Sequence, residues 1–223
     1  MLPIAAPIPT LAGVEVGVHI SLPAPIVFAA PPAVIVLPDT NDVYVAPDVD
    51  VDLFFWNGWW WRPWEGGWYR SRYYDRGWVY YSHVPSFYFD VDPGWRGYYR
   101  HHDWYGRRWN YERIPNQRLQ KNWKTWHNDR HWEGQRTWGV QNYHPRTQPQ
   151  RKELRHQREQ EYQHRPEVQR HQQQTREQQK QHQGQQSRQQ SQERVHQQKG
   201  EKRPQDQKPQ HSQPQNEPEG GRR

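Results

Sequence analysis

The chain has 223 residues, of which 31% are hydrophobic, and its formal net charge is +7. It contains no cysteine, which excludes disulfides, thiolate metal ligands and a thiol nucleophile. Leu, Ile, Val and Phe account for 34 residues, and only three of these lie beyond residue 145. This distribution predicts one folded domain followed by a tail that has too few apolar side chains for a core.

Charge divides the chain into an acidic first part and a basic remainder. Residues 1–61 contain six acidic residues and no Lys or Arg, whereas residues 62–145 and 146–223 carry net charges of +6 and +7. This asymmetry favours attraction between the two parts or adhesion to an anionic polymer. Acidic and basic residues alternate closely in the last part, which weakens its attraction for nucleic acid.

Residues 1–12 are apolar and uncharged, and they end in Thr10-Leu11-Ala12 before Gly13. Small residues at the first and third of these positions suit a signal peptidase. Because a basic n-region is missing, we expect residues 1–12 to be the remnant of a signal peptide that starts upstream, with a flexible terminus as the alternative. The predicted location is periplasmic or secreted. No transmembrane segment is predicted, since prolines interrupt the longest apolar stretch, residues 16–38.

Alternation of apolar and polar residues predicts two half-buried strands in the first part of the chain. Residues 14–22 alternate Val and Ile with polar side chains, and residues 49–55 alternate apolar residues with aspartate. Between them we expect edge strands or an extended linker around residues 26–28 and 34–37, where prolines break the pattern, and a turn at residues 38–42.

Residues 54–111 contain ten Trp, ten Tyr and four Phe. Asn57-Gly58 is a strong hairpin signal because both positions of such a turn need positive φ. Gly67-Trp68, Gly77-Trp78 and Gly94-Trp95 repeat a glycine–aromatic theme, and short strands at this spacing indicate an antiparallel meander. Large aromatic side chains can build a small core where aliphatic ones are scarce.

Residues 116–132 predict one amphipathic helix packed on this meander. Leu119, Trp123 and Trp126 fall at i, i+4 and i+7, Pro115 suits a helix start, and Gly134 suits a helix end.

Residues 146–223 are rich in Gln, Arg, Glu and His. Without an apolar stripe this part is expected to be a disordered tail, with helical bias over about residues 151–198. The predicted fold class is therefore mainly β, within α+β: a small aromatic-rich antiparallel meander over residues 13–145, one packed helix and a long disordered C-terminal tail.

The run from Tyr44 to Tyr74, with its Asp-Leu-Phe-Phe-Trp-Asn-Gly-Trp-Trp-Trp centre, resembles a core found in uncharacterised exported proteins of Gram-negative bacteria. Residues 84–88 and 93–99 extend the resemblance, which covers about residues 14–145 and is similar in style to proteins with Tyr-x-Trp-Gly-x-Trp repeats. It implies an envelope or periplasmic location and brings no catalytic residues.

The candidate ligand-binding residues are tryptophans of the meander: Trp59, Trp60, Trp61, Trp64, Trp68 and Trp78. Consecutive strand residues point to opposite faces, so Trp60 cannot share one core with both of its neighbours, and the pattern predicts exposed indole surface. Indoles flanked by Arg can stack on sugar rings of an envelope polysaccharide, or on bases. The alternative is an aromatic core in which both faces of the sheet are covered.

Two groups of polar residues are weaker candidates. Asp48, Asp50 and Asp52 would share one face of a strand, where they would hold a hard cation, act as paired carboxylates or form ion pairs with Arg62, Arg70 or Arg72. His127 and His131, at i and i+4 of the predicted helix, have the spacing of metal ligands, although the His-Glu-x-x-His motif is absent.

The sequence lacks a Gly-x-Ser-x-Gly motif, a phosphate-binding loop and a dinucleotide fingerprint, so we predict no enzymatic activity and no cofactor. The preferred function is a non-enzymatic interaction or structural role in the cell envelope, with an anionic polymer or a polysaccharide as partner. The alternatives are a basic nucleic-acid-binding protein and a metal-binding periplasmic protein. The absence of an RNA- or DNA-binding motif argues against nucleic acid. The sequence carries no signal for an oligomeric state.

Overall fold

A computed structural model describes residues 22–134 and 138–201. Its backbone divides into two compact units, which meet between Gln178 and Gln179. The expected signal-peptide remnant at residues 1–12 lies outside the described residues, as does the strand expected over residues 14–22, apart from its last residue. None of the described helices has the length and apolar character needed to cross a membrane.

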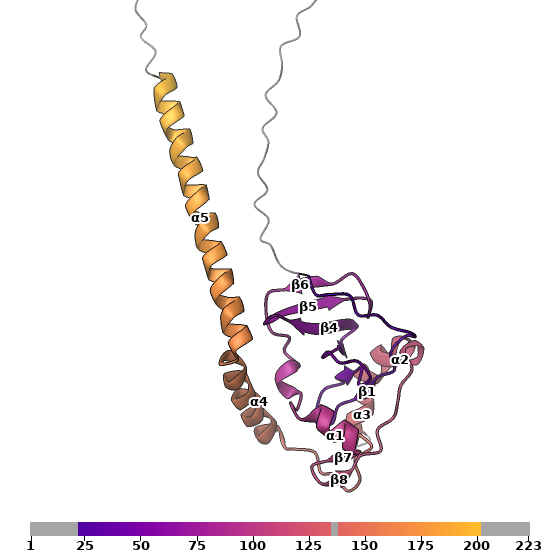
Figure 1. The fold of residues 1–223 in the computed structure, drawn as a ribbon. Helices are drawn as coiled ribbons and strands as arrows, with labels where there is room; N and C mark the ends of the chain where they lie inside the picture. Colours follow the sequence, from indigo (N-terminus) through magenta and orange to yellow (C-terminus); the bar gives the residue numbers. More distant parts are fainter. Residues whose placement is uncertain (1–21, 135–137, 202–223) are drawn as a thin grey trace, which may run out of the picture. The chain divides into compact units, whose positions relative to one another are not determined.

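The first unit is built on a six-stranded antiparallel sheet whose strands are ordered as in the sequence (Figure 1). The strands are β1 (Ile35–Val36), β2 (Tyr44–Val45), β3 (Phe54–Trp56), β4 (Trp59–Trp64), β5 (Gly67–Ser71) and β6 (Val79–Tyr81). A smaller sheet pairs β7 (Asp103–Trp104) with β8 (Arg107–Arg108). Together with the helices, this arrangement confirms the predicted α+β fold with an aromatic antiparallel meander.

Tight turns set the register of the central hairpins. Asn57 and Gly58 have φ values of 48° and 76°, and they join β3 to β4 with Trp56 opposite Trp59. Glu65 and Gly66 repeat this geometry, with φ values of 48° and 80°, between β4 and β5. The predicted Asn-Gly hairpin is confirmed, since both residues adopt the left-handed conformation that such a turn needs.

Other strand boundaries differ from the predictions. Residues 48–52 form a turn, so the strand expected over residues 49–55 is limited to β3. The edge strand expected near residues 34–37 is β1, whereas residues 26–28 form no strand. Trp95 begins the helix α1 (Trp95–His101) instead of a strand. The Asp92 carboxylate accepts a hydrogen bond from the Gly94 backbone N–H at 2.9 Å, which stabilises this helical start.

The helix predicted over residues 116–132 is present as two helices, α2 (Asn116–Asn128) and α3 (His131–Gly134). Arg130 between them has a φ of 48°, which a continuous helix does not allow. Leu119 and Trp126 are buried in the core, as their spacing predicts.

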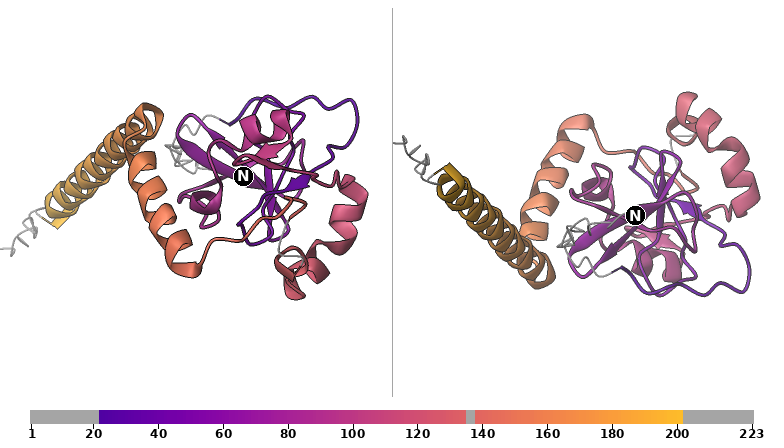
Figure 2. Two further views of the ribbon diagram at one scale, coloured as in Figure 1. Left: turned by 90° about the horizontal axis from the view of Figure 1, so that it is seen from below. Right: turned by 90° about the horizontal axis from the view of Figure 1, so that it is seen from above.

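Both faces of the sheet are covered by aromatic side chains. On one face, Phe55 meets Trp123 of α2 at 6.0 Å between ring centroids, and the Trp132 indole of α3 donates to the Tyr44 hydroxyl at 2.8 Å. On the other face, Phe54 meets Phe87 at 5.6 Å, just before the 3₁₀ helix η1 (Tyr88–Asp90). Two views show α2 and α3 on one side of the sheet and α4 on the other (Figures 1 and 2).

The helical bias expected over about residues 151–198 of the tail is observed as two helices, α4 (Gln148–Gln163) and α5 (Pro166–Glu201). Thr147 and Gln150 form a capping box at the start of α4. Tyr162 is buried, and its hydroxyl accepts a hydrogen bond from the Trp68 indole at 3.0 Å. Val168 at the start of α5 is also buried beside Phe89. These few apolar contacts hold α4 and the start of α5 against the rest of the first unit, although the composition of this segment predicts no buried contacts.

The second unit begins within α5. Its side chains form local hydrogen bonds along the helix, such as Ser187 Oγ to the Gln183 carbonyl at 2.8 Å and Ser191 Oγ to the Ser187 carbonyl at 2.8 Å. Residues 202–223, the end of the expected tail, lie outside the described residues.

Candidate functional site

The six candidate tryptophans do not form one exposed row. Trp60, Trp61 and Trp68 are at most 3% exposed. Side chains of β4 and β5 alternate between the two faces of the sheet, and other aromatic residues cover both faces. Trp60 packs against Phe55 at 5.3 Å on one face, and Trp61 packs against Tyr81 at 5.0 Å on the other. The expectation of an exposed row is therefore corrected, and the covered aromatic core is the arrangement observed.

The three half-buried members, Trp59, Trp64 and Trp78, each lie against an arginine. The Arg70 and Arg72 guanidiniums lie 4.6 and 3.6 Å from the Trp59 ring centroid. Arg62 lies 5.3 Å from Trp64 and 5.7 Å from Trp78. Because residues 59 and 64 of one strand point to opposite faces, these indoles make two separate clusters.

The three aspartates are not aligned on a strand. Asp48 forms an ion pair with Arg113 and accepts a hydrogen bond from the Tyr99 hydroxyl at 3.0 Å. Asp52 pairs with Arg96 at 3.1 Å, and Asp50 lies in the turn between the two. Ion pairing is thus the observed role of Asp48 and Asp52, although their partners are not the arginines that the sequence suggested.

The two candidate histidines lie on different helices. His127 Nδ1 is 3.1 Å from Asp42 Oδ2, whereas the His131 ring stacks on Trp126 at 5.7 Å. The helix break at Arg130 separates them, so they lose the i, i+4 geometry that metal binding would use. Among the side chains that the structure describes, no group of three His, Cys, Asp or Glu residues gathers as a metal site.

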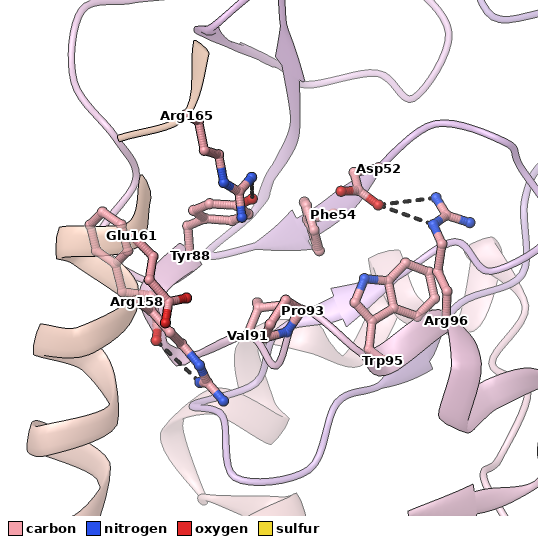
Figure 3. Close-up of a pocket in the computed structure, with 11 residues that line it drawn as sticks. Asp52, Phe54, Tyr88, Val91, Pro93, Trp95, Arg96, Arg158, Glu161 and Arg165 are labelled. Atoms are coloured by element: carbon pink, nitrogen blue, oxygen red, sulfur yellow. Dashed lines mark hydrogen bonds and ion pairs between the residues drawn. The ribbon is translucent and has the colours of Figure 1, made fainter. Parts of the chain in front are cut away.

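A cavity of about 220 Å³ opens between the sheet, η1, α1 and α4 (Figure 3). Its apolar wall is formed by Phe54, Tyr88, Phe89, Val91, Pro93 and Trp95, and its polar rim by Asp52, Arg96, Arg158, Glu161 and Arg165. The volume is below the roughly 300–1,000 Å³ of sites for drug-sized ligands, so the cavity suits one small ring.

Arg96 is held rigidly at one side of the cavity. It donates to Asp52 Oδ1 at 3.1 and 3.2 Å and to the carbonyls of Val49 and Val51 at 2.9 and 2.6 Å. These bonds leave Asp52 Oδ2 without a hydrogen bond from any residue that the structure describes. The pair thus presents one available carboxylate oxygen and little net charge.

The opposite rim comes from α4 and the turn that follows it. Arg158 donates to Asp92 at 2.8 Å and to the carbonyls of Phe89 and Asp90 at 3.3 and 3.0 Å, so it is also neutralised and fixed. The Glu161 carboxylate has no hydrogen-bond partner within the described ranges. It is therefore available to a ligand, and Figure 3 shows it on the rim of the cavity.

Arg165 lies against the aromatic wall. Its Nη1 donates to the Tyr88 hydroxyl at 3.0 Å, and its other guanidinium donors have no acceptor among the described residues. Burial raises the pKa of Tyr88, so this hydroxyl stays protonated at neutral pH. Glu161 and Arg165 are thus the acid and the base of the rim that form no ion pair among the described residues, with Glu167 as the carboxylate near Arg165.

A second hollow of about 630 Å³ lies between Asp39, Asp90 and the start of α4. Four of its charged groups are already paired, as in Arg155 Nε to Asp90 Oδ1 at 3.0 Å and Arg151 to Asp39 at 3.8 Å. No aromatic side chain lines it. We therefore take the aromatic cavity as the candidate site.

Comparison with protein-family models, with curated proteins and with solved structures finds no match for this chain. The class of protein follows from the fold itself: an α+β protein built on a six-stranded antiparallel meander with an aromatic core.

Proposed function

We propose that the protein is a non-enzymatic binding protein of the bacterial cell envelope that holds one sugar ring of a polysaccharide in the aromatic cavity. The observation that carries this proposal is the available Glu161 carboxylate beside the Arg165 donors and the Tyr88 ring. Sugar hydroxyls both donate and accept hydrogen bonds, and sugar ring faces pack on aromatic rings.

The charge balance of the rim favours a neutral sugar in this cavity. Asp52 compensates Arg96, and Asp92 compensates Arg158. Glu161 and Arg165 then remain as one negative and one positive group. A neutral ring with several hydroxyls can bind both without leaving a charge uncompensated, whereas an anion would face the Glu161 carboxylate.

Location in the envelope is supported by the sequence alone. The apolar residues 1–12 and the resemblance of residues 14–145 to exported proteins of Gram-negative bacteria favour export. The lack of cysteine is compatible with an oxidising compartment.

The test is co-sedimentation of the full chain with purified cell-wall polysaccharide at low and high salt. The full chain is needed because α4 and the turn after it supply Arg158, Glu161 and Arg165, so a fragment that ends at residue 145 lacks three of the five rim residues. We expect binding that persists at high salt, since hydrogen bonds and stacking are less sensitive to salt than contacts between opposite charges.

Glu161→Gln and Glu159→Gln form a matched pair on one helix, because Glu159 is exposed and does not line the cavity. Glu161→Gln keeps an acceptor oxygen but removes its charge. It should weaken binding about tenfold, because a hydrogen bond to a charged group is stronger than a neutral one, whereas Glu159→Gln should bind normally. Equal binding by both variants, or complete release by salt, would contradict the proposal.

A further inference from the structure

Arg62 in β4 is a buried positive charge without a carboxylate beside it. Its side chain is 1% exposed, and its Nη1 donates to the Ala24 carbonyl at 2.7 Å. Within residues 22–134 and 138–201, no Asp or Glu forms an ion pair with it. Burial lowers the pKa of its guanidinium, and no neighbouring charge opposes this effect. A buried charge of this kind is costly unless an anion accompanies it.

Two indole N–H groups beside this guanidinium also lack a hydrogen-bond acceptor among the described residues. The ring centroids of Trp64 and Trp78 lie 5.3 and 5.7 Å from Arg62 Cζ. Arg62 Nε, Trp64 Nε1 and Trp78 Nε1 are all buried, and none has a hydrogen-bond acceptor in the part of the chain that the structure describes. Buried donors in folded proteins are nearly always paired, so three unpaired donors around one cation indicate a missing acceptor.

The arginines of the aromatic cavity show how this protein otherwise stabilises such groups. Arg96 and Arg158 are less buried than Arg62, yet each pairs with an aspartate and also donates to backbone carbonyls. Among the described residues, Arg62 donates to one carbonyl, that of Ala24. The difference lies in the missing negative charge, which an anionic ligand would supply.

We propose that Arg62, Trp64 and Trp78 bind a carboxylate or phosphate oxygen of an acidic sugar. The oxyanion accepts hydrogen bonds from Arg62 Nε and from the indole N–H groups, and the half-buried indole rings pack on the sugar ring. This site lies apart from the aromatic cavity, with no lining residue in common, so it does not depend on the proposed function.

The cover over Arg62 is an irregular stretch of chain. Residues 22–28 form neither helix nor strand, and the side chains of Leu22 and Val27 are 65% and 93% exposed. The hydrogen bond from Arg62 ties Ala24 to the sheet. Entry of a ligand therefore requires displacement of a short segment and leaves the sheet itself intact.

The experiment measures binding to the full chain by isothermal titration calorimetry with three probes. Trigalacturonate carries carboxylates, glucose 6-phosphate carries a phosphate, and maltotriose is neutral. We expect at least one acidic probe to bind, and the probe that binds identifies the source of the oxyanion. Arg62→Gln and Trp78→Phe should each weaken that binding about tenfold or more, because each removes a hydrogen bond to a charged group.

Trp78→Phe keeps an aromatic ring and remains informative if Arg62→Gln does not fold. Trp123→Phe on α2 is the matched control, since Trp123 is also half-buried, lies outside this cluster and should leave binding unchanged. Failure of both acidic probes to bind at about 10 mM, or unchanged binding in both site variants, would overturn the proposal. Equal binding of maltotriose with equal loss in the variants would also overturn it.

The alternative to an external ligand is a carboxylate of the chain itself that pairs with Arg62. Glu15, outside the described residues, is the acidic residue that precedes Ala24 most closely in the sequence. If Glu15→Gln lowers the free energy of unfolding in the wild type and has no effect in the Arg62→Gln background, the chain supplies its own anion and the proposal is overturned. Equal effects of Glu15→Gln in both backgrounds would support an external ligand.

Discussion

Tyr162→Phe tests whether α4 is an integral part of the folded domain. The substitution removes the hydroxyl that accepts the Trp68 indole N–H at 3.0 Å, while it keeps the ring. Trp68 and Tyr162 are 1% and 4% exposed, so water cannot replace the lost acceptor without rearrangement. An unsatisfied buried donor costs about 1–3 kcal/mol. For a domain of this size the midpoint of thermal unfolding should fall by about 2–4 °C per kcal/mol.

Urea unfolding monitored by tryptophan fluorescence measures this cost. Tyr73→Phe is the matched control, because Tyr73 is 53% exposed and its loss of a hydroxyl should change stability by less than about 0.5 kcal/mol. Tyr162→Ala should cost more, about 3–5 kcal/mol, since it also removes ring contacts with Tyr88 and Phe89 at 5.6 and 5.7 Å. If Tyr162→Phe and Tyr162→Ala both behave like Tyr73→Phe, α4 does not pack on the sheet and the reasoning is refuted.

Three further predictions concern turns and titrating groups. Gly58→Ala should lower the free energy of unfolding by about 2–4 kcal/mol, because the φ of Gly58 is 76° and a Cβ there would lie 2.7 Å from Trp123. Gly106→Ala is the control: its φ is 78° but the space around it is open, so it should lower this free energy by only about 1–2 kcal/mol. Urea unfolding measures both. Equal costs would show that Trp123 does not pack on the turn. Asp48→Asn should lower stability at pH 7 by less than about 1 kcal/mol and have little effect at pH 2: the hydrogen bond from Arg113 holds the pKa of Asp48 below its ordinary 3.8, so the stabilisation exists above that value and is lost as the pH falls through the lowered pKa. A loss of the same size at both pH values would contradict this assignment. Burial and the hydrogen bond to Asp39 raise the pKa of Tyr143 from 10 to about 12, so its stabilisation is complete below pH 10 and is lost as the pH rises toward 12 and above. Ultraviolet titration of Tyr143→Phe should lack one late-titrating tyrosine, and an unchanged curve would exclude the assignment.

The meander was predictable because its signals are local. Asn57-Gly58 specifies a turn type by backbone conformation alone, and the strand on each side follows from it. The prediction that the aspartates at residues 48–52 share one face of a strand was wrong, because alternation along the chain does not reveal distant ion-pair partners. Arg96 and Arg113 lie more than 40 positions away in the sequence, and their ion pairs with Asp52 and Asp48 occur in a turn instead of a strand.

The candidate site was missed because three of its five rim residues come from a segment that looks too polar to fold. A signal was nevertheless present. Tyr162 is the sole aromatic residue beyond residue 146, and Arg151, Arg155 and Arg158 precede it at heptad spacing on one helical face. Their ion-pair partners, Asp39, Asp90 and Asp92, come from two separate parts of the chain, so composition alone could not identify the stripe as an interface.

The hydrogen bond between Trp68 and Tyr162 also has a consequence for the order in which the chain folds. The hairpins of the sheet join neighbouring segments, so they can form as soon as about residue 81 has been synthesised. Their cover on the Trp68 side is encoded some 80 to 90 residues later, in α4 and the start of α5. In a chain cut short before α4, the Trp68 and Tyr88 rings lose the cover that Tyr162 provides, and exposed apolar surface of this kind promotes aggregation. Packing of the polar C-terminal segment thus determines when the nascent protein loses its tendency to aggregate.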